Sequence, residues 1–435
     1  GVQNTRIGGL AGTTLTTGGY NSVLGYNALA SATTGANNVA IGRQALYATT
    51  TGANNVSVGL NSMFANTTGS DNVAVGASAL GLATTAANNT AVGKSALGAN
   101  TTGANNAAVG RESLLSNTTG ASNVAFGSTS LDANTTGSFN TALGQASLGA
   151  STTASNNTAV GYGAMLLNTT GTQNVSLGAY ALDANTTASN NTAVGYASLT
   201  ANTTGAKNSA FGYGALASNT TGGSNVALGF AALTTNITGS RNVSVGNESL
   251  QKTTVNNNTA VGFQALEENT TGTQNVAVGT YALDENTTAN NNTAIGYASL
   301  SANTTGANNV ALGYVSLGSN TTGGNNTAVG YASLNANTTG TPNTAVGYQA
   351  GTAITTGDNN TAMGYRALYT EDTGNRSVAI GDYALYVQNN DDSNYNTAVG
   401  YSAGTSVTTG VNNILIGGLA GDALTTGNAN VLLGF

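Results

Sequence analysis

The chain has 435 residues, of which 6% are charged, compared with about 25% in a typical globular protein. It contains no Cys and no His, which excludes disulfides, imidazole catalysis and metal sites built from these residues. The 9 basic and 16 acidic residues give a net charge of −7, and no apolar run approaches 18 residues. We therefore expect no nucleic-acid partner and no membrane insertion.

One repeat fills the whole chain. A glycine preceded by an apolar residue recurs every 17 residues from Gly8 to Gly246 and, after one step of 16, from Gly262 to Gly381. A step of 19 leads to Gly400, and two further glycines complete 26 copies. A fixed period of this kind predicts stacked, equivalent units rather than a disordered chain.

Each repeat predicts β structure. Segments such as residues 191–195, Asn-Thr-Ala-Val-Gly, are short and alternating, and Asn-Thr-Thr-Gly turns separate them. About 17 residues at about 3.3 Å each make a flattened coil of two strands and two turns. We expect an all-β parallel β-solenoid, or β-roll, of about 26 coils with a 17-residue repeat. At about 4.8 Å per coil it would be a rod on the order of 125 Å long.

Residues 1–435 are expected to form a single continuous β-roll array that is a segment of a longer fibre. The step of 19 places an insertion loop at residues 386–395, which include Asp391 and Asp392. A protruding loop with carboxylates and carbonyls is a weak candidate for a Ca²⁺ site, and a bulged loop without a ligand is the preferred interpretation. We expect no cofactor.

Constant positions in the repeat indicate where side chains pack. With the motif glycine as position 0, position −1 is apolar in every copy, as at Val58 and Val194, and we expect it to form a continuous core ladder. Further ladders are expected at position 0 (Gly195), at position +4 (Leu199) and at position −4 (Asn191). The glycine at position 0 is invariant, which predicts a positive φ or a close backbone approach.

Four copies depart from this pattern in a correlated way. In each of them position +4 is glycine, and position +7, which is usually Asn, is apolar. We interpret these copies as variant coils that fill the same interior from its other edge, because protein interiors keep a close-packed density. The pairs are Gly12 with Leu15, Gly351 with Ile354, Gly404 with Val407, and Gly421 with Leu424.

A single coil offers too little apolar surface to offset the conformational entropy of ordering its residues. Position −2 is small, as at Ala40, Ala74 and Ala91, and would form a flat stripe that another chain could approach closely. We therefore expect self-association into a homotrimer, with these small residues and part of position −1 at the contact.

Aromatic residues recur at position +1 in the second half of the chain. We expect them to form a stripe that packs between chains; the alternative is an exposed stripe that stacks on the sugar rings of a host-surface glycan or receptor. In the first half the same position holds residues such as Arg43 and Lys94. The stripe is carried by Tyr297, Tyr314, Tyr331, Tyr348 and Tyr365.

Paired carboxylates are the only plausible catalytic groups. Adjacent residues on a strand point to opposite faces, so no pair predicts a general acid and base. We expect no enzymatic activity and interpret these residues as solvated turns. The pairs are Glu267 with Glu268, Asp284 with Glu285, Glu371 with Asp372, and Asp391 with Asp392.

The pattern N-x-[VT]-A-[VI]-G resembles the head repeats of trimeric autotransporter adhesins, and similar Asn-Thr-Ala-Val-Gly-Tyr arrays occur in bacteriophage tail-fibre proteins. The resemblance implies a parallel β-roll packed as a trimer. The expected function is a non-enzymatic structural fibre or stalk of an extracellular appendage, on a virion or a cell surface, that presents receptor-binding elements. The alternatives are an ice-binding protein that uses stacked Thr ladders and a free extracellular filament subunit.

Overall fold

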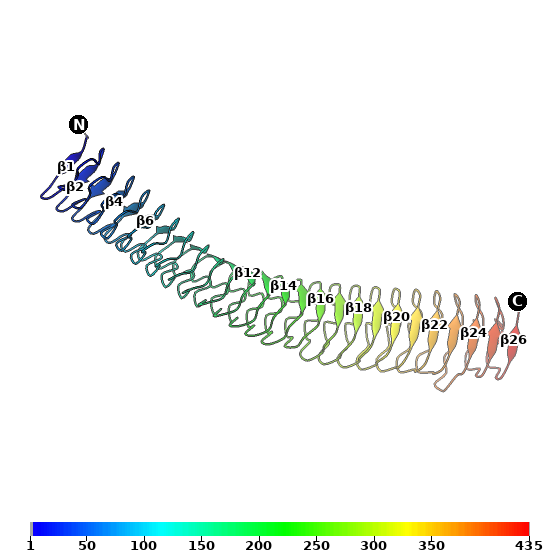
Figure 1. The fold of residues 1–435 in the computed structure, drawn as a ribbon. Helices are drawn as coiled ribbons and strands as arrows, with labels where there is room; N and C mark the ends of the chain where they lie inside the picture. The colour runs from blue at the N-terminus through cyan, green and yellow to red at the C-terminus, as the bar shows by residue number, and fades with distance from the viewer. Residues whose placement is uncertain (1–2, 435) are drawn as a thin grey trace. The chain divides into compact units, whose positions relative to one another are not determined.

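The computed structural model describes residues 3–434. They form an all-β parallel β-solenoid of about 25 turns with a repeat of about 17 residues, which confirms the predicted fold class. The chain consists of two compact units, unit 1 (Gly1–Gly222) and unit 2 (Gly223–Phe435). In each unit, every coil contributes one short strand, and loops complete the turn (Figure 1).

The strands of both units are three residues long. Unit 1 contains β1 (Thr5–Ile7), β2 (Ser22–Leu24), β3 (Val39–Ile41), β4 (Val56–Val58), β5 (Val73–Val75), β6 (Thr90–Val92), β7 (Ala107–Val109), β8 (Val124–Phe126), β9 (Thr141–Leu143), β10 (Thr158–Val160), β11 (Val175–Leu177), β12 (Thr192–Val194) and β13 (Ser209–Phe211). Unit 2 contains β14 (Val226–Leu228), β15 (Val243–Val245), β16 (Thr259–Val261), β17 (Val276–Val278), β18 (Thr293–Ile295), β19 (Val310–Leu312), β20 (Thr327–Val329), β21 (Thr344–Val346), β22 (Thr361–Met363), β23 (Val378–Ile380), β24 (Thr397–Val399), β25 (Ile414–Ile416) and β26 (Val431–Leu433).

Within each unit, successive strands pair in parallel and in register. In unit 1, Val58 of β4 lies opposite Val75 of β5. In unit 2, Val329 of β20 lies opposite Val346 of β21. Equivalent positions of neighbouring coils therefore touch, so each repeat packs mainly against copies of itself.

The expectation of two strands in each coil is wrong, because a coil has one. The rest of the coil is broken by residues with left-handed backbone conformations, such as Asn61 (φ 56°) and Met63 (φ 47°). A residue with positive φ cannot continue an extended strand. The turn backbone still bonds from coil to coil, as in the 2.9 Å hydrogen bond from the Met63 N–H to the Ala79 carbonyl.

The core ladder predicted at position −1 is also wrong. Val58 and Val194 are only half-buried, and Phe126 at the same position is 58% exposed. Alternate residues of a strand point to opposite faces. In a three-residue strand the middle residue points inward, so both of its neighbours, at positions −1 and −3, lie on the outside.

The small residues at position −2 face inward instead of forming an outer stripe. Ala40, Ala74 and Ala91 are fully buried, and so is Leu199 at position +4. The interior of each coil thus combines one large side chain with small ones. Position −2 is small because of packing inside its own chain, and these residues cannot form a contact between chains.

Two of the four variant coils fill their interior as expected, and in the other two Leu15 and Leu424 are half-buried. Ile354 and Val407 at position +7 are fully buried. A Cβ atom added to Gly351 would lie 3.0 Å from the Ile354 side chain. The side chain at position +7 therefore occupies the space that a Leu at position +4 fills in the other coils.

Two columns of buried Asn connect each coil to the next. The Asn191 N–H donates to Asn174 Oδ1 of the preceding coil (2.9 Å), and Asn191 Nδ2 donates to the Gly205 carbonyl (2.9 Å). Asn202, at position +7, donates from Nδ2 to the same Gly205 carbonyl (3.0 Å) and to Asn185 Oδ1 (3.0 Å). Each side-chain bond of this kind contributes about 1 kcal/mol net, and a buried amide without its partner costs about 1–3 kcal/mol.

The glycine at position 0 has positive φ in every coil, between 106° and 145°, as predicted. Gly195 has a φ of 131°, and an added Cβ would lie 2.5 Å from the Gly212 carbonyl oxygen of the next coil. Both the backbone conformation and the close approach exclude a side chain at this position.

Replacing Gly195 with Ala is expected to lower the free energy of unfolding by at least about 1–3 kcal/mol, because Ala is strained at this φ and meets the next coil. The matched control is Gly81→Ala, since Gly81 does not have positive φ, an added Cβ there lies no closer than 3.2 Å to another atom, and Phe64 occupies the equivalent position one coil earlier. The measurement is urea-induced unfolding followed by circular dichroism. Equal losses in the two variants would contradict this account of the motif glycine.

Candidate interaction surface

The outer strand face consists of positions −3 and −1 of every coil. Position −3 is Thr, Ser, Val, Ala or Ile in all copies, and position −1 is Val, Ile, Leu, Phe or Met. No charged residue occurs at either position, although the chain carries 25 Lys, Arg, Asp and Glu residues elsewhere (9 basic plus 16 acidic). In each unit, a continuous uncharged surface therefore follows the strands.

Large apolar side chains on the outer strand face are accessible to solvent. In unit 1, Leu177 is 47% exposed. In unit 2, Leu228 and Leu312 are 48% and 42% exposed. Because equivalent strands are in register, the side chains at position −1 follow one another from coil to coil within each unit. Large contiguous apolar patches mark interaction sites.

The five tyrosines predicted to form a stripe do lie together in unit 2. Neighbouring rings have centroids 5.0–5.3 Å apart and planes within 5–12° of parallel. Each of these side chains is between 36% and 48% exposed. The stacking follows from the in-register pairing, which repeats the same side chain at the spacing between coils.

The stripe is longer than the sequence indicated, because tyrosines at position +2 extend it. The Tyr281 ring lies edge-on between Phe263 (5.5 Å) and Tyr297 (6.1 Å). The Tyr383 ring lies in the same way between Tyr365 (5.3 Å) and Tyr401 (6.4 Å). The aromatic stripe of unit 2 thus runs through nine consecutive coils.

Unit 1 has a shorter aromatic stripe of the same design. Tyr162, Tyr196 and Tyr213 are at position +1, and Tyr180, at position +2, lies edge-on between the first two. The signal in the sequence was the small Ala179 at position +1, beside which the tyrosine one residue later takes the vacant place in the column.

Parallel stacking limits what the stripe can bind. Both faces of an interior ring such as Tyr331 are covered by its neighbours, so its edge and its hydroxyl face the solvent. A sugar ring stacks on an aromatic face rather than on an edge. The interior tyrosines therefore favour edge contacts with another surface over the stacking of a glycan.

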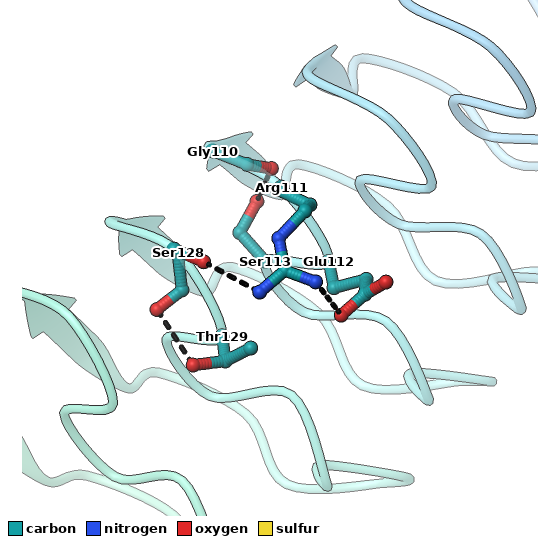
Figure 2. Close-up of polar contacts among 6 residues, drawn as sticks. All are labelled: Gly110, Arg111, Glu112, Ser113, Ser128 and Thr129. Carbon is teal, nitrogen blue, oxygen red and sulfur yellow. Dashed lines mark hydrogen bonds and ion pairs between the residues drawn. The ribbon is translucent and has the colours of Figure 1, made fainter.

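In unit 1 position +1 also carries basic residues. Figure 2 shows Arg111, whose guanidinium donates to Glu112 Oε2 (3.0 Å) and to Ser128 Oγ of the next coil (3.4 Å). The Arg111 side chain is 59% exposed. Such an exposed ion pair contributes little to stability, so Arg111 is a solvated surface group.

The paired carboxylates lie in different environments. Burial raises the pKa of Asp284 to about 6, against opposing hydrogen bonds from the backbone, and Glu268 forms an ion pair with Lys252. In the insertion loop, Asp391 Oδ1 accepts a hydrogen bond from Thr373 Oγ1 (2.9 Å), and both Asp391 and Asp392 are exposed. Among residues 3–434, no group of three or more acidic side chains is placed to hold a metal ion.

Glu371 differs from the solvated turn residue that the sequence predicts, because it is fully buried. It occupies position +7, where most coils have Asn. Its carboxylate accepts hydrogen bonds from Gln388 Nε2 (2.7 Å), Asn394 Nδ2 (2.8 Å) and the Gly374 N–H (2.8 Å). Gln388 Nε2 also donates to Ser377 Oγ (2.7 Å). The sequence marks this site because Asn is absent from both position −4 and position +7 in the coils beside the insertion.

Burial raises the pKa of Glu371 above its ordinary value of 4.5, against opposing hydrogen bonds from Gln388 and the Gly374 N–H. The folded state therefore holds the Glu371 proton more tightly than the unfolded chain. This contribution to stability is present below the ordinary pKa and is lost as the pH rises through the higher folded pKa.

Glu371→Gln is expected to remove this part of the pH dependence, because Gln stays neutral. Unfolding free energies measured between about pH 4 and pH 7 should fall more steeply with rising pH in the natural chain than in the variant. The other carboxylates are common to both proteins and cancel in the difference. Parallel curves for the two proteins would contradict the raised pKa.

The two Thr columns differ in what they expose. At position +8 the hydroxyl of Thr203 donates to the Thr220 carbonyl of the next coil (3.1 Å). Only the following residue, Thr204 at position +9, is exposed. This coil thus exposes one Thr of the pair, and where both are exposed, as at Thr270 and Thr271, they are adjacent in the chain. A flat hydroxyl array needs Thr at alternate residues of a strand.

No protein-family model matches this chain, and a search of curated proteins finds no match. Among residues 3–434, no helix is long and apolar enough to cross a membrane.

Proposed function

We propose that this chain is a non-enzymatic structural segment of an extracellular appendage, either a virion tail fibre or a cell-surface adhesin. The supporting observation is the repetition of one coil plan, in register, throughout each unit. Stacked units of this kind supply length and stiffness and require no chemistry. Thirteen strands at about 4.8 Å span on the order of 60 Å in each unit.

The appendage assembles as a homotrimer through the outer strand face and the aromatic stripe. Five tyrosines at 36–48% exposure offer on the order of 400 Å² of aromatic surface, given roughly 150–250 Å² for each side chain. Positions −3 and −1 of the strands that precede these tyrosines add further area. A standard interface buries about 800 Å² on each partner, so the available surface is sufficient.

A second copy of the chain is the partner that fits this surface. Equivalent contacts can repeat along this face only if the partner has the same spacing between coils. A second copy of the chain has that spacing. The absence of charge at positions −3 and −1 allows like faces to meet without burying unpaired charges. The number of three chains rests on the resemblance to trimeric adhesin heads.

Aspartates on the outer strand face are expected to disrupt the assembly, because each would bury an unpaired charge at the contact. The natural chain should sediment at close to three times 42.5 kDa, and the variant should sediment as a folded monomer. A folded natural monomer would contradict self-association. The variant replaces Val160, Leu177 and Val194 with Asp, and the control replaces the exposed Thr170, Thr187 and Thr204 with Asp.

The extracellular role is tested by electron microscopy with gold-labelled antibodies against this chain. Label is expected along thin projections outside a virion or a cell. Label confined to the cell interior would rule out the proposed role. Purified protein without appendages provides the control for antibody specificity.

A further inference from the structure

Position +5 of unit 1 carries large side chains in some coils and glycine in others. The rings of Tyr47 and Phe64 stack in successive coils, with centroids 5.1 Å apart and planes 4° from parallel. The next two coils have Gly81 and Gly98 at this position, and Leu115 follows. The aromatic stack therefore ends at Phe64, and its outward face meets two coils without side chains.

The hollow beside the pair of glycines differs from the one beside a single glycine in its lining rather than in its size. The hollow at Gly149 has a volume of about 400 Å³, and its lining includes the charged Asp132 and no aromatic residue. At the isolated Gly149, the place of a missing Cβ is approached by the Leu166 side chain (3.2 Å) and by Asp132 Oδ1 (3.6 Å). Gly98 is covered in the same way by Leu115 (3.2 Å). At Gly81 the three nearest atoms within 4 Å belong to the backbone, so no neighbouring side chain covers it.

The resulting notch, here called the Phe64 notch, has a volume of about 390 Å³, which lies within the range of small-molecule sites, about 300–1,000 Å³. Its walls include the apolar side chains of Phe64, Leu82 and Leu115, and its polar groups come from Asn61, Ser78 and Ser95. None of the lining residues is charged.

The polar groups beside the notch lack partners inside the protein. Ser78 is exposed and Ser95 is half-buried, and neither side-chain hydroxyl takes part in a hydrogen bond found within residues 3–434. Asn61 Oδ1 is buried and has no hydrogen-bond partner. Because Oδ1 is shielded from solvent, a ligand in the notch reaches Asn61 through Nδ2, which is not among the buried unpaired atoms. A ligand with hydroxyl groups would satisfy these donors and acceptors, and a purely apolar ligand would leave them unpaired.

We propose that the Phe64 notch binds one pyranose ring of a neutral glycan. The C–H face of the sugar packs on the free face of Phe64, as Tyr47 packs on the other face, and its hydroxyls bond to Ser78, Ser95 and Asn61. The uncharged lining matches a neutral sugar rather than an acidic one. The notch would give the proposed appendage a receptor-binding element, so its biological meaning rests on the proposed function.

The test is saturation-transfer NMR on the full chain with methyl α-D-glucopyranoside, methyl α-D-mannopyranoside and methyl β-D-galactopyranoside at millimolar concentration. Transfer to the ring C–H protons of at least one sugar is expected. Phe64→Ala should weaken that binding by about 2- to 10-fold, the usual range for loss of one aromatic contact.

Filling the notch provides the sharper comparison. Gly81→Tyr continues the Tyr47–Phe64 stack into the notch and should abolish the sugar signal. The second variant, Gly98→Leu, repeats the residue of the next coil and should also affect the sugar signal. The matched control Gly149→Tyr places the same side chain at an isolated glycine, and the sugar signal should not change. Circular dichroism verifies that each variant is folded.

Three results would overturn the proposal. The first is no transfer to any of the three sugars, and the second is a sugar signal unaffected by Gly81→Tyr and Gly98→Leu. The third is that these variants change the sedimentation of the protein but not the sugar signal, which would assign the notch to contact with a second copy. These results do not bear on where the chain lies on a virion or a cell, which antibody labelling tests without any sugar. The two proposals can therefore fail separately.

Discussion

The structure depends on the pairing of buried amides between coils. Asn191 and its equivalents sit where water cannot reach, so each needs partners, and neighbouring coils supply them. Asn174 Oδ1 of the preceding coil accepts from the Asn191 N–H, and the Gly205 turn carbonyl accepts from Asn191 Nδ2. The Gly205 carbonyl accepts from Asn191 and Asn202 together, which fixes the turn to both sides of the coil. Because one coil cannot meet this requirement alone, the repeat is stable only when stacked.

Amides and small side chains in the interior leave the larger apolar residues to the surface. Leu199 is the one large side chain that its coil buries, and Val194 in the same coil is left half-exposed. This arrangement is the reverse of most soluble proteins, in which an exposed apolar patch of this extent is uncommon. It accounts for a surface that suits another chain of the same repeat.

Sequence reasoning predicted the parallel solenoid, its period and the positive φ of Gly195. Each of these follows from the stacking of equivalent positions in successive coils. It could not decide which face of the strand is inside, since positions −2 and −1 are both uncharged in every coil except that of Arg6, and the larger residue is usually the buried one. The charge of Glu371 suggested solvent, whereas its place in the Asn column indicated burial. Tyr281 was missed because it reaches the aromatic stripe from one residue further along the chain.

The most direct test is hydrogen exchange of the Asn side-chain amides, followed by NMR of the assembled protein. If the amides of Asn191 and Asn202 are buried and bonded to neighbouring coils, their NH₂ protons will exchange far more slowly than those of the exposed Asn190. If all three exchange at the rate of a free Asn side chain, the coils are not held together by buried amides, and the account fails.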